Sequence, residues 1–219
     1  LKKGDKIVNI NGFISEFKNE YSNSSIELKF ESSIANDIIL GPLIVKNHIN
    51  NSNEVLIQDS KNILYLINDR GQVEWTREID GKIIKEINQI DSYKNGKLQY
   101  VFATKKGLYL LDRKGRNVGK FPLKFNDQIT KPLSVFDYDN NKNYRLLITQ
   151  GDELFMFDSK GNRVRGFDYD KKAKILTKPK HFRISNKDII VFKTSDELVI
   201  LNRRGKIRIE PDIKYSYSD

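Results

Sequence analysis

One eight-residue phrase occurs four times in this chain, and it constrains the fold more than any other feature of the sequence. It reads LYLINDRG at Leu64–Gly71 and returns as LYLLDRKG, LFMFDSKG and LVILNRRG, which end at Gly115, Gly161 and Gly205. Successive final glycines lie 44, 46 and 44 residues apart. A period of this length is typical of repeat proteins in which each copy folds into one small β-sheet of a larger array.

Each repeat contains runs of residues that are typical of short β-strands. The β-branched and aromatic runs EVLIQ, QYVFAT, RLLIT and DIIVFK are each followed by a small polar turn and then by the repeated phrase. Helical periodicity is absent from these segments. The repeat therefore predicts a four-stranded antiparallel meander, with strands A to D in chain order. Such sheets bury their faces by stacking around an axis, which favours a β-propeller over a solenoid or a sandwich.

The repeated phrase also predicts its own turn. An Asx residue stands three positions before each final glycine, and its side chain can accept hydrogen bonds from the backbone of a type I turn. The glycine then takes the positive φ that closes a three-residue hairpin with a bulge. The four Asx residues are Asn68, Asp112, Asp158 and Asn202.

The repeat sets the expected domain organisation. Residues 1–35 are predicted to form an incoming partial blade and linker, with a hairpin around Asn11 and Gly12 and an outer strand at Ser25–Phe30. Four propeller repeat units follow at 36–80, 81–128, 129–175 and 176–210, and a polar tail occupies 211–219. We therefore expect an all-β chain whose blades of about 44–46 residues make a partial propeller or the C-terminal part of a larger one.

Composition narrows the function classes. The chain has 39 basic and 29 acidic side chains, a net charge of +10, and therefore favours acidic proteins or other anionic surfaces as neighbours. It has no cysteine, which excludes disulfides, thiol catalysis and cysteine-ligated zinc. Its longest apolar stretch, residues 38–45, is far shorter than the roughly 20 residues that a transmembrane helix needs.

No catalytic or cofactor motif is legible. The sequence contains no nucleophile elbow and no phosphate-binding loop, and His48 and His181 do not occupy corresponding repeat positions. We therefore predict that the protein is not an enzyme and that it has no catalytic, cofactor-binding or metal-binding residues.

One loop partly resembles a calcium-binding sequence. DYDNNKNYR places Asp137, Asp139 and Asn141 at alternating positions, as in the first half of a calcium loop. However, Lys142 stands where such loops need glycine, and Arg145 replaces the late acidic ligand. This pattern predicts an Asx-rich hairpin turn rather than a metal site.

The most informative side chains precede the turn glycines. The A-to-B and C-to-D turns of a meander lie at the same end of the sheet, so repeated cations there should share one rim, with Lys94, Lys97, Lys142 and Arg145 from the other hairpins. We interpret this rim as the binding surface for a protein partner or an anionic surface; the alternative is that these charges only aid solubility and discourage edge pairing. The predicted partner-binding residues are Arg70, Arg113, Lys114, Lys160, Arg203 and Arg204.

A second basic run occupies residues 170–180, with the sequence DKKAKILTKPK. Binding of nucleic acid normally adds interleaved aromatic residues for base stacking, and this run has none. DNA or RNA is therefore a disfavoured partner.

The first repeat carries a family resemblance. LYLINDRGQVEW resembles the repeat of quinoprotein-type (PQQ-like) β-propellers, in which an aromatic-aliphatic strand leads to Asp or Asn, a glycine turn and a tryptophan. Asn68, Gly71 and Trp75 match that pattern. The chain is also similar to scaffold propellers of bacterial outer-membrane assembly and to uncharacterised bacterial envelope proteins with a propeller-like C-terminal half.

The later repeats depart from the family at the tryptophan, which is replaced by Gly119, Arg165 and Ile209. In the family these tryptophans dock neighbouring blades, so packing here is expected to rely on Tyr65, Tyr109, Phe155 and adjacent aliphatic residues. The polar cluster that would hold a quinone and its calcium ion is not evident in the sequence.

The resemblance implies a non-enzymatic scaffold that binds protein partners within a larger complex of the bacterial cell envelope, with no cofactor. Two alternatives stay open. A degenerate carbohydrate- or ligand-binding propeller would need an exposed aromatic platform, for which Tyr93, Tyr138 and Tyr144 are the loop candidates. A vestigial quinoprotein-like enzyme would need convergent polar groups in a central funnel.

Overall fold

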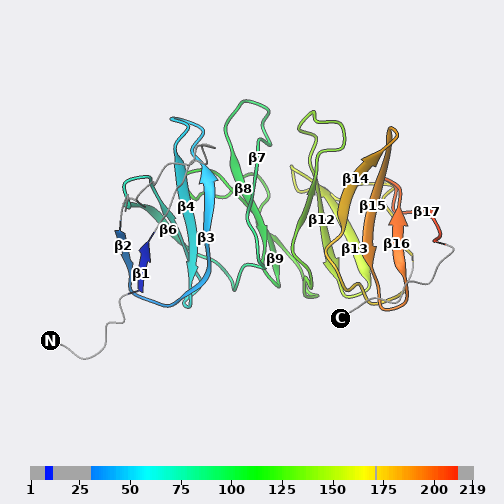
Figure 1. Ribbon diagram of the computed structural model, residues 1–219, viewed down its shortest axis with the longest axis horizontal. Helices are drawn as coiled ribbons and strands as arrows, with labels where there is room; N and C mark the ends of the chain where they lie inside the picture. The colour runs from blue at the N-terminus through cyan, green and yellow to red at the C-terminus, as the bar shows by residue number, and fades with distance from the viewer. Residues whose placement is uncertain (1–7, 12–30, 171, 212–219) are drawn as a thin grey trace, which may run out of the picture. The chain divides into compact units, whose positions relative to one another are not determined.

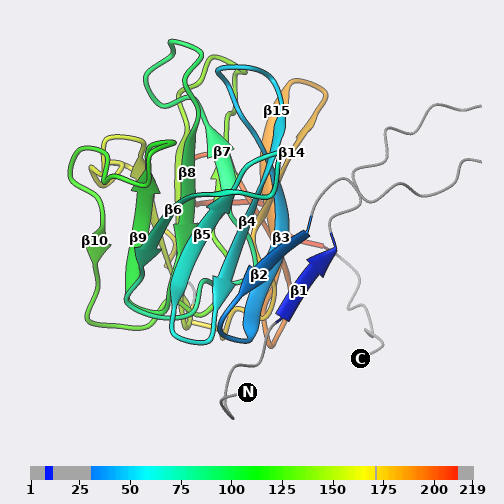
Figure 2. The same cartoon turned by 90° about the vertical axis from the view of Figure 1, so that its left-hand side faces the viewer.

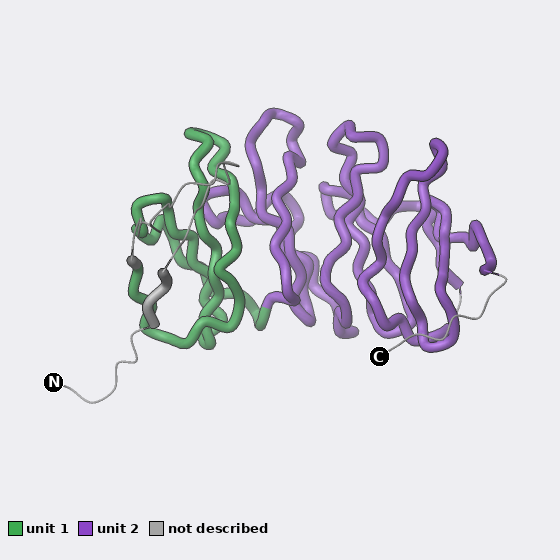
Figure 3. Tube along the Cα trace, viewed as in Figure 1, with its two compact units in different colours: residues 1–82 green, residues 83–219 purple. Residues whose placement is uncertain are grey.

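A computed structural model of the chain describes residues 8–11, 31–170 and 172–211, and every regular element within these ranges is a β-strand (Figure 1). The predicted all-β class is confirmed. No helix that is long and apolar enough to cross a membrane occurs in the described part of the chain. The chain divides into two compact units, residues 1–82 and residues 83–219 (Figure 3).

The described part of the first unit contains one complete four-stranded meander. Its sheet runs in the order β3(Ile38–Lys46), β4(Asn53–Asp59), β5(Ile63–Ile67) and β6(Val73–Glu78), and all neighbours are antiparallel. A separate two-stranded sheet pairs β1(Val8–Asn11) with β2(Glu31–Ile34) (Figure 2). Ile34 of β2 packs with Val55, Ile57 and Ile67 in a buried cluster. The expected outer strand at 25–30, and the part of the expected hairpin beyond Asn11, lie outside the described residues.

The second unit contains three further antiparallel meanders. The β7–β10 sheet consists of β7(Asn88–Ile90), β8(Gln99–Ala103), β9(Gly107–Leu111) and β10(Leu123–Lys124). The β11–β13 sheet consists of β11(Ser134–Phe136), β12(Arg145–Gln150) and β13(Glu153–Asp158). The β14–β17 sheet consists of β14(Lys180–Ile184), β15(Lys187–Lys193), β16(Leu198–Leu201) and β17(Ile207–Ile209).

The β11–β13 sheet has three strands where the repeat predicts four. At the expected position of its fourth strand, Phe157 and Arg163 form only an isolated bridge. Beyond that bridge Phe167 is buried in the cluster shared with the next sheet, and the Asp168 amide donates to the Arg204 carbonyl at 2.9 Å. Packing against the next sheet therefore draws the chain away from the edge of β13.

Within residues 83–170 and 172–211, two apolar clusters join neighbouring sheets of the second unit. One joins the β7–β10 and β11–β13 sheets, and the other joins the β11–β13 and β14–β17 sheets. Strand β12 supplies both, because Leu146 and Ile148 point into the first cluster and Leu147 points into the second. A strand that is buried on both faces explains why its sequence, RLLIT, does not alternate between apolar and polar residues.

The predicted corner turns are confirmed in all four repeats. The final glycines have φ values of 79°, 74°, 82° and 81° in chain order, and each donates its amide to the Asx carbonyl. The Asx side-chain oxygen accepts two further backbone N–H groups, at distances between 2.7 and 3.3 Å. The residue just before the glycine, always Arg or Lys, donates one of those N–H groups, so the turn fixes the backbone of the repeated cation.

Candidate functional site

The six predicted partner-binding residues lie at these corner turns. Arg70 belongs to the first unit and is exposed, while the other five lie in the second unit. Lys114, Lys160 and Arg204 are also exposed. Arg113 and Arg203, which stand one residue earlier in their turns, are half-buried. The repeat position directly before the glycine therefore supplies the cations that solvent reaches best.

Within the second unit, polar contacts connect the A-to-B turns to one another and to a corner turn. Lys142 Nζ lies 2.6 Å from Asp91 Oδ2, and Lys94 Nζ donates to Asn143 at 2.7 Å, so neighbouring A-to-B turns are bridged twice. Arg203, from the β16–β17 corner, reaches Asp139 in the β11–β12 turn. These contacts confirm that the two kinds of turn share one end of the second unit, but they also occupy several of the cations expected to be available there.

The A-to-B turns themselves are Asx-capped. Asp91 is 3% exposed and accepts the amides of Asn95 and Gly96 at 3.0 and 2.9 Å. Burial by itself raises the pKa of Asp91, but its hydrogen bonds, above all from Lys142, hold that pKa below its ordinary value. The Asp137 carboxylate likewise accepts the backbone amides of residues 141 and 142. The loop that partly resembles a calcium-binding sequence is thus an Asx turn, as predicted.

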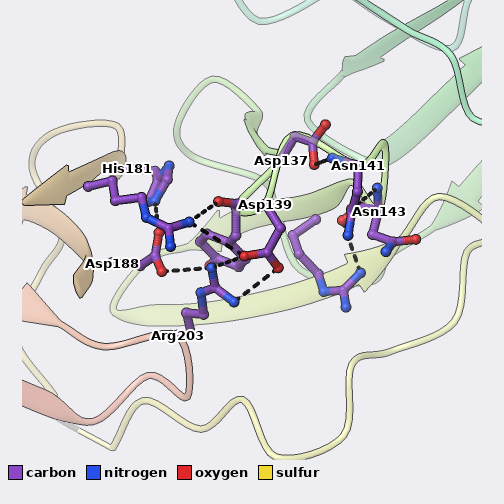
Figure 4. A network of polar contacts seen from close by, with 10 residues as sticks. Asp137, Asp139, Asn141, Asn143, His181, Asp188 and Arg203 are labelled. Carbon is purple, nitrogen blue, oxygen red and sulfur yellow. Dashed lines mark hydrogen bonds and ion pairs between the residues drawn. The ribbon is translucent and has the colours of Figure 1, made fainter. Parts of the chain in front are cut away.

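Asp139 lies in a charged network between the last two sheets (Figure 4). Arg203 grips Asp139 through both terminal nitrogens, at 3.1 and 2.6 Å, and reaches Asp188 at 2.7 Å. Asp188 also pairs with His181 Nε2 at 2.8 Å. Burial of Asp188 tends to raise its pKa, but hydrogen bonds from His181 and Arg203 outweigh that effect and lower it. Arg203 therefore links a half-exposed carboxylate to a buried one.

An aromatic side chain lies beneath this network. The Arg203 guanidinium lies 4.7 Å from the Tyr138 ring centre, and the His181 ring meets the same ring edge-on at 4.8 Å. Tyr138 is only 8% exposed, which contradicts its assignment as part of an exposed aromatic platform. Tyr144 is half-buried and its hydroxyl accepts the Asp91 amide at 3.3 Å. Of the three loop tyrosines, Tyr93 alone is exposed, at 60%.

Replacing Tyr138 with phenylalanine should leave stability unchanged or raise it by up to about 1 kcal/mol. The Tyr138 hydroxyl is buried, and no described residue hydrogen-bonds to it, so the variant keeps the ring contacts and loses only a desolvated polar group. Urea unfolding followed by circular dichroism measures the difference. A clear loss of stability would show that the hydroxyl has a partner within the folded protein.

A hollow of about 490 Å³ opens beside the network, and every side chain that lines it is polar or charged. Arg183 contributes to one wall and is held by the Tyr138 carbonyl at 2.9 Å and by Asp139 at 3.5 Å. The remaining lining residues are Asn186, Lys187, Asp188, Asn202, Arg203, Arg204 and Arg208. The arrangement is suited to binding anionic groups.

The sequence pattern could not reveal most of this site. Arg203 and Arg204 are visible as repeated corner cations, but Arg183 and Asp188 occupy no repeated motif. They come from the hairpin of β14 and β15, whose sequence KHFRISNKDIIVFK reads as two ordinary strands. The available signal in the sequence is the charged pair Lys187 and Asp188, which stands at the start of the strand KDIIVFK and therefore at an A-to-B turn.

The positive charge of the second basic run, residues 170–180, is partly neutralised by ion pairs. Lys172 pairs with Glu153 at 3.0 Å and Lys178 with Glu86 at 2.6 Å. Lys174 and Lys180 are exposed, and residue 171 lies outside the described part of the chain. This run therefore contributes less available charge than its sequence suggests.

No family model and no curated protein match the chain. Similar solved structures include BBS1N in complex with ARL6DN. The crystal soaked with lead has a TM-score of 0.56 at 10% identity over 80% of this chain and 54% of that chain. The crystal soaked with mercury has a TM-score of 0.52 at 10% identity, with coverages of 74% and 50%. BamB from Moraxella catarrhalis has a TM-score of 0.43 at 14% identity over 80% of this chain and 47% of that chain.

This chain therefore spans about half the length of each of these three solved chains. At 10% identity, the likeness to BBS1N shows the fold alone. Together with the successive antiparallel meanders, it identifies the chain as an all-β protein with a partial β-propeller fold.

Proposed function

We propose that this chain is a non-enzymatic interaction module that binds a protein partner with an acidic surface. The observation that carries the proposal is the repeated corner turn, which fixes the backbone of an exposed Arg or Lys at the same position in four sheets. A net charge of +10 attracts acidic partners from a distance and speeds their association.

The fold supports this reading by analogy. BBS1N was crystallised in complex with another protein, ARL6DN, so a structure of this kind can present a surface to a protein partner. The location in the bacterial cell envelope, as part of a larger complex, follows from the resemblance to PQQ-like propellers and belongs to the same proposal. The carbohydrate-binding alternative loses support because Tyr138 is buried.

Reversing the four corner cations should abolish partner binding and leave the melting temperature unchanged. The variant carries glutamate in place of Arg70, Lys114, Lys160 and Arg204, all of which are exposed. Because only their backbones take part in the turns, the fold does not depend on these side chains. Affinity capture with cross-linking, followed by mass spectrometry, identifies the partners that the parent chain retains and the variant loses.

The matched control reverses four exposed lysines near the B-to-C turns, which lie at the other end of the sheets. These are Lys61, Lys105, Lys106 and Lys174. Both variants change the net charge equally, so a general loss of attraction would appear in both. If the corner variant keeps the same partners as the parent, or if the control loses them equally, the corner turns are not the binding surface.

A further inference from the structure

We propose that the hollow beside Arg203 is a binding site for an acidic peptide segment, one whose Asp or Glu side chains enter it. This inference rests on the proposed function, because it names the chemistry by which the partner would be recognised. It extends the surface beyond the corner turns to Lys187 and Arg208, which no repeat pattern singles out.

The charges that line the hollow do not cancel. Five cations and two carboxylates line it, an excess of three positive charges. Both carboxylates are already engaged, since Asp139 is held by Arg183 and Arg203, and Asp188 by Arg203 and a histidine. The excess is therefore carried by the three remaining cations, Lys187, Arg204 and Arg208.

Two of the three remaining cations are partly fixed within the fold, Arg208 at its side chain and Arg204 at its backbone. Arg208 donates its Nε–H to the Asp188 carbonyl at 3.3 Å, which orients its guanidinium. Arg204 has its backbone fixed by the Asn202 side chain at 2.7 Å. Lys187 is the first residue of β15 and is exposed. Side chains that are held before binding lose less conformational entropy when a ligand arrives.

The size and lining of the hollow favour a peptide carboxylate over other anions. A volume of about 490 Å³ holds a few side chains rather than an extended polymer. Arginine forks bind carboxylates through paired hydrogen bonds, as they also bind phosphates, so the choice between anions rests on the size and lining of the hollow. Bases of single-stranded nucleic acid would need an exposed aromatic surface, but the tyrosine below Arg203 is buried. Insertion into lipid would need apolar side chains, whereas every lining residue is polar.

The test measures binding of a fluorescein-labelled peptide of eight glutamates to the full 219-residue chain by fluorescence anisotropy at low salt. The hollow variant combines Lys187→Gln and Arg208→Gln, both at exposed positions outside the corner cations. The control variant combines Lys105→Gln and Lys106→Gln, which removes equal charge at the exposed β8–β9 turn, away from both the hollow and the corner cations. The hollow variant should bind at least about tenfold more weakly than the control, because two charge-assisted contacts are lost.

Two results would overturn the inference: no saturable binding of the peptide, or equal affinities for the two variants. If the hollow variant loses its native circular dichroism spectrum, Lys187→Gln alone is compared with Lys105→Gln, and equal affinities for those two variants would overturn the inference. Competition with a DNA oligonucleotide or with phosphatidylserine vesicles tests the other anions. Stronger, hollow-dependent binding of either would reassign the site.

The outcomes also separate this inference from the proposed function. If the captured partners depend on the corner cations, but the peptide binds the hollow variant and its control equally well, the inference fails and the proposed function stands. If the peptide requires the hollow but no partner depends on the corner cations, the proposed function fails alone.

Discussion

Replacing Gly205 with alanine should destabilise the protein by about 2 to 4 kcal/mol, more than the same change at the corner glycine Gly161, where the nearest atom to an added Cβ belongs to a side chain. Gly205 has φ +81°, a conformation that L side chains rarely adopt. An added Cβ would also lie 2.7 Å from the Asp168 carbonyl oxygen and 2.9 Å from its carbon. Because these are backbone atoms, the chain itself must move, and the hydrogen bond between the Asp168 amide and the Arg204 carbonyl would be distorted.

The matched control is Gly166→Ala in the same unit. Gly166 has φ +80°, almost the same backbone conformation, but an added Cβ there would meet nothing within 4 Å. It therefore measures the backbone strain alone, about 1 kcal/mol. Urea unfolding should be followed by circular dichroism, since the single tryptophan, Trp75, lies in the other unit. Equal losses of stability in the two variants would show that the close approach of the Asp168 backbone to Gly205 adds nothing to the cost of the substitution.

Gly205 shows what the sequence predicts and where its pattern ends. The repeat predicts a glycine with positive φ, and the Asx residue three positions earlier predicts the turn that requires it. It does not predict the collision with Asp168, because the path of that segment is set by the burial of Phe167 between two sheets. Packing across sheets is not encoded in a local turn motif, so the same phrase gives a three-stranded sheet in one repeat and four-stranded sheets in the others.

The candidate site, too, is predicted in part by the repeat and determined in part by contacts between sheets. Meander geometry predicts that the A-to-B and C-to-D turns share one end, and the contact between Asp139 and Arg203, 64 residues apart, bears this out in the second unit. The sequence pattern treats Arg203 and Arg204 alike, as adjacent corner cations. In the structure Arg203 is held by two carboxylates and Arg204 is not. Only the three-dimensional pairing distinguishes a cation that builds the site from one available to a partner.

Replacing Asp188 with asparagine should cost about 2 kcal/mol of stability at neutral pH, because a buried carboxylate that pairs with Arg203 and accepts from His181 is lost. Asp188 is 7% exposed and accepts from both His181 and Arg203. Its pKa in the folded protein lies below the ordinary value of 3.8, since those hydrogen bonds outweigh the effect of burial. The ionised carboxylate therefore contributes stability that is fully present above about pH 4 and is lost as the pH falls through the lowered pKa.

The difference between parent and Asp188→Asn should consequently be largest near neutral pH and shrink in acid, which urea unfolding at a series of pH values would measure. Asp139→Asn is the matched control, because Asp139 shares the Arg203 partner but its side chain is 48% exposed, so water can replace the carboxylate. Its stability should remain close to that of the parent. If Asp188→Asn is as stable as the parent at pH 7, or if its deficit is the same at pH 3, the buried carboxylate does not anchor Arg203.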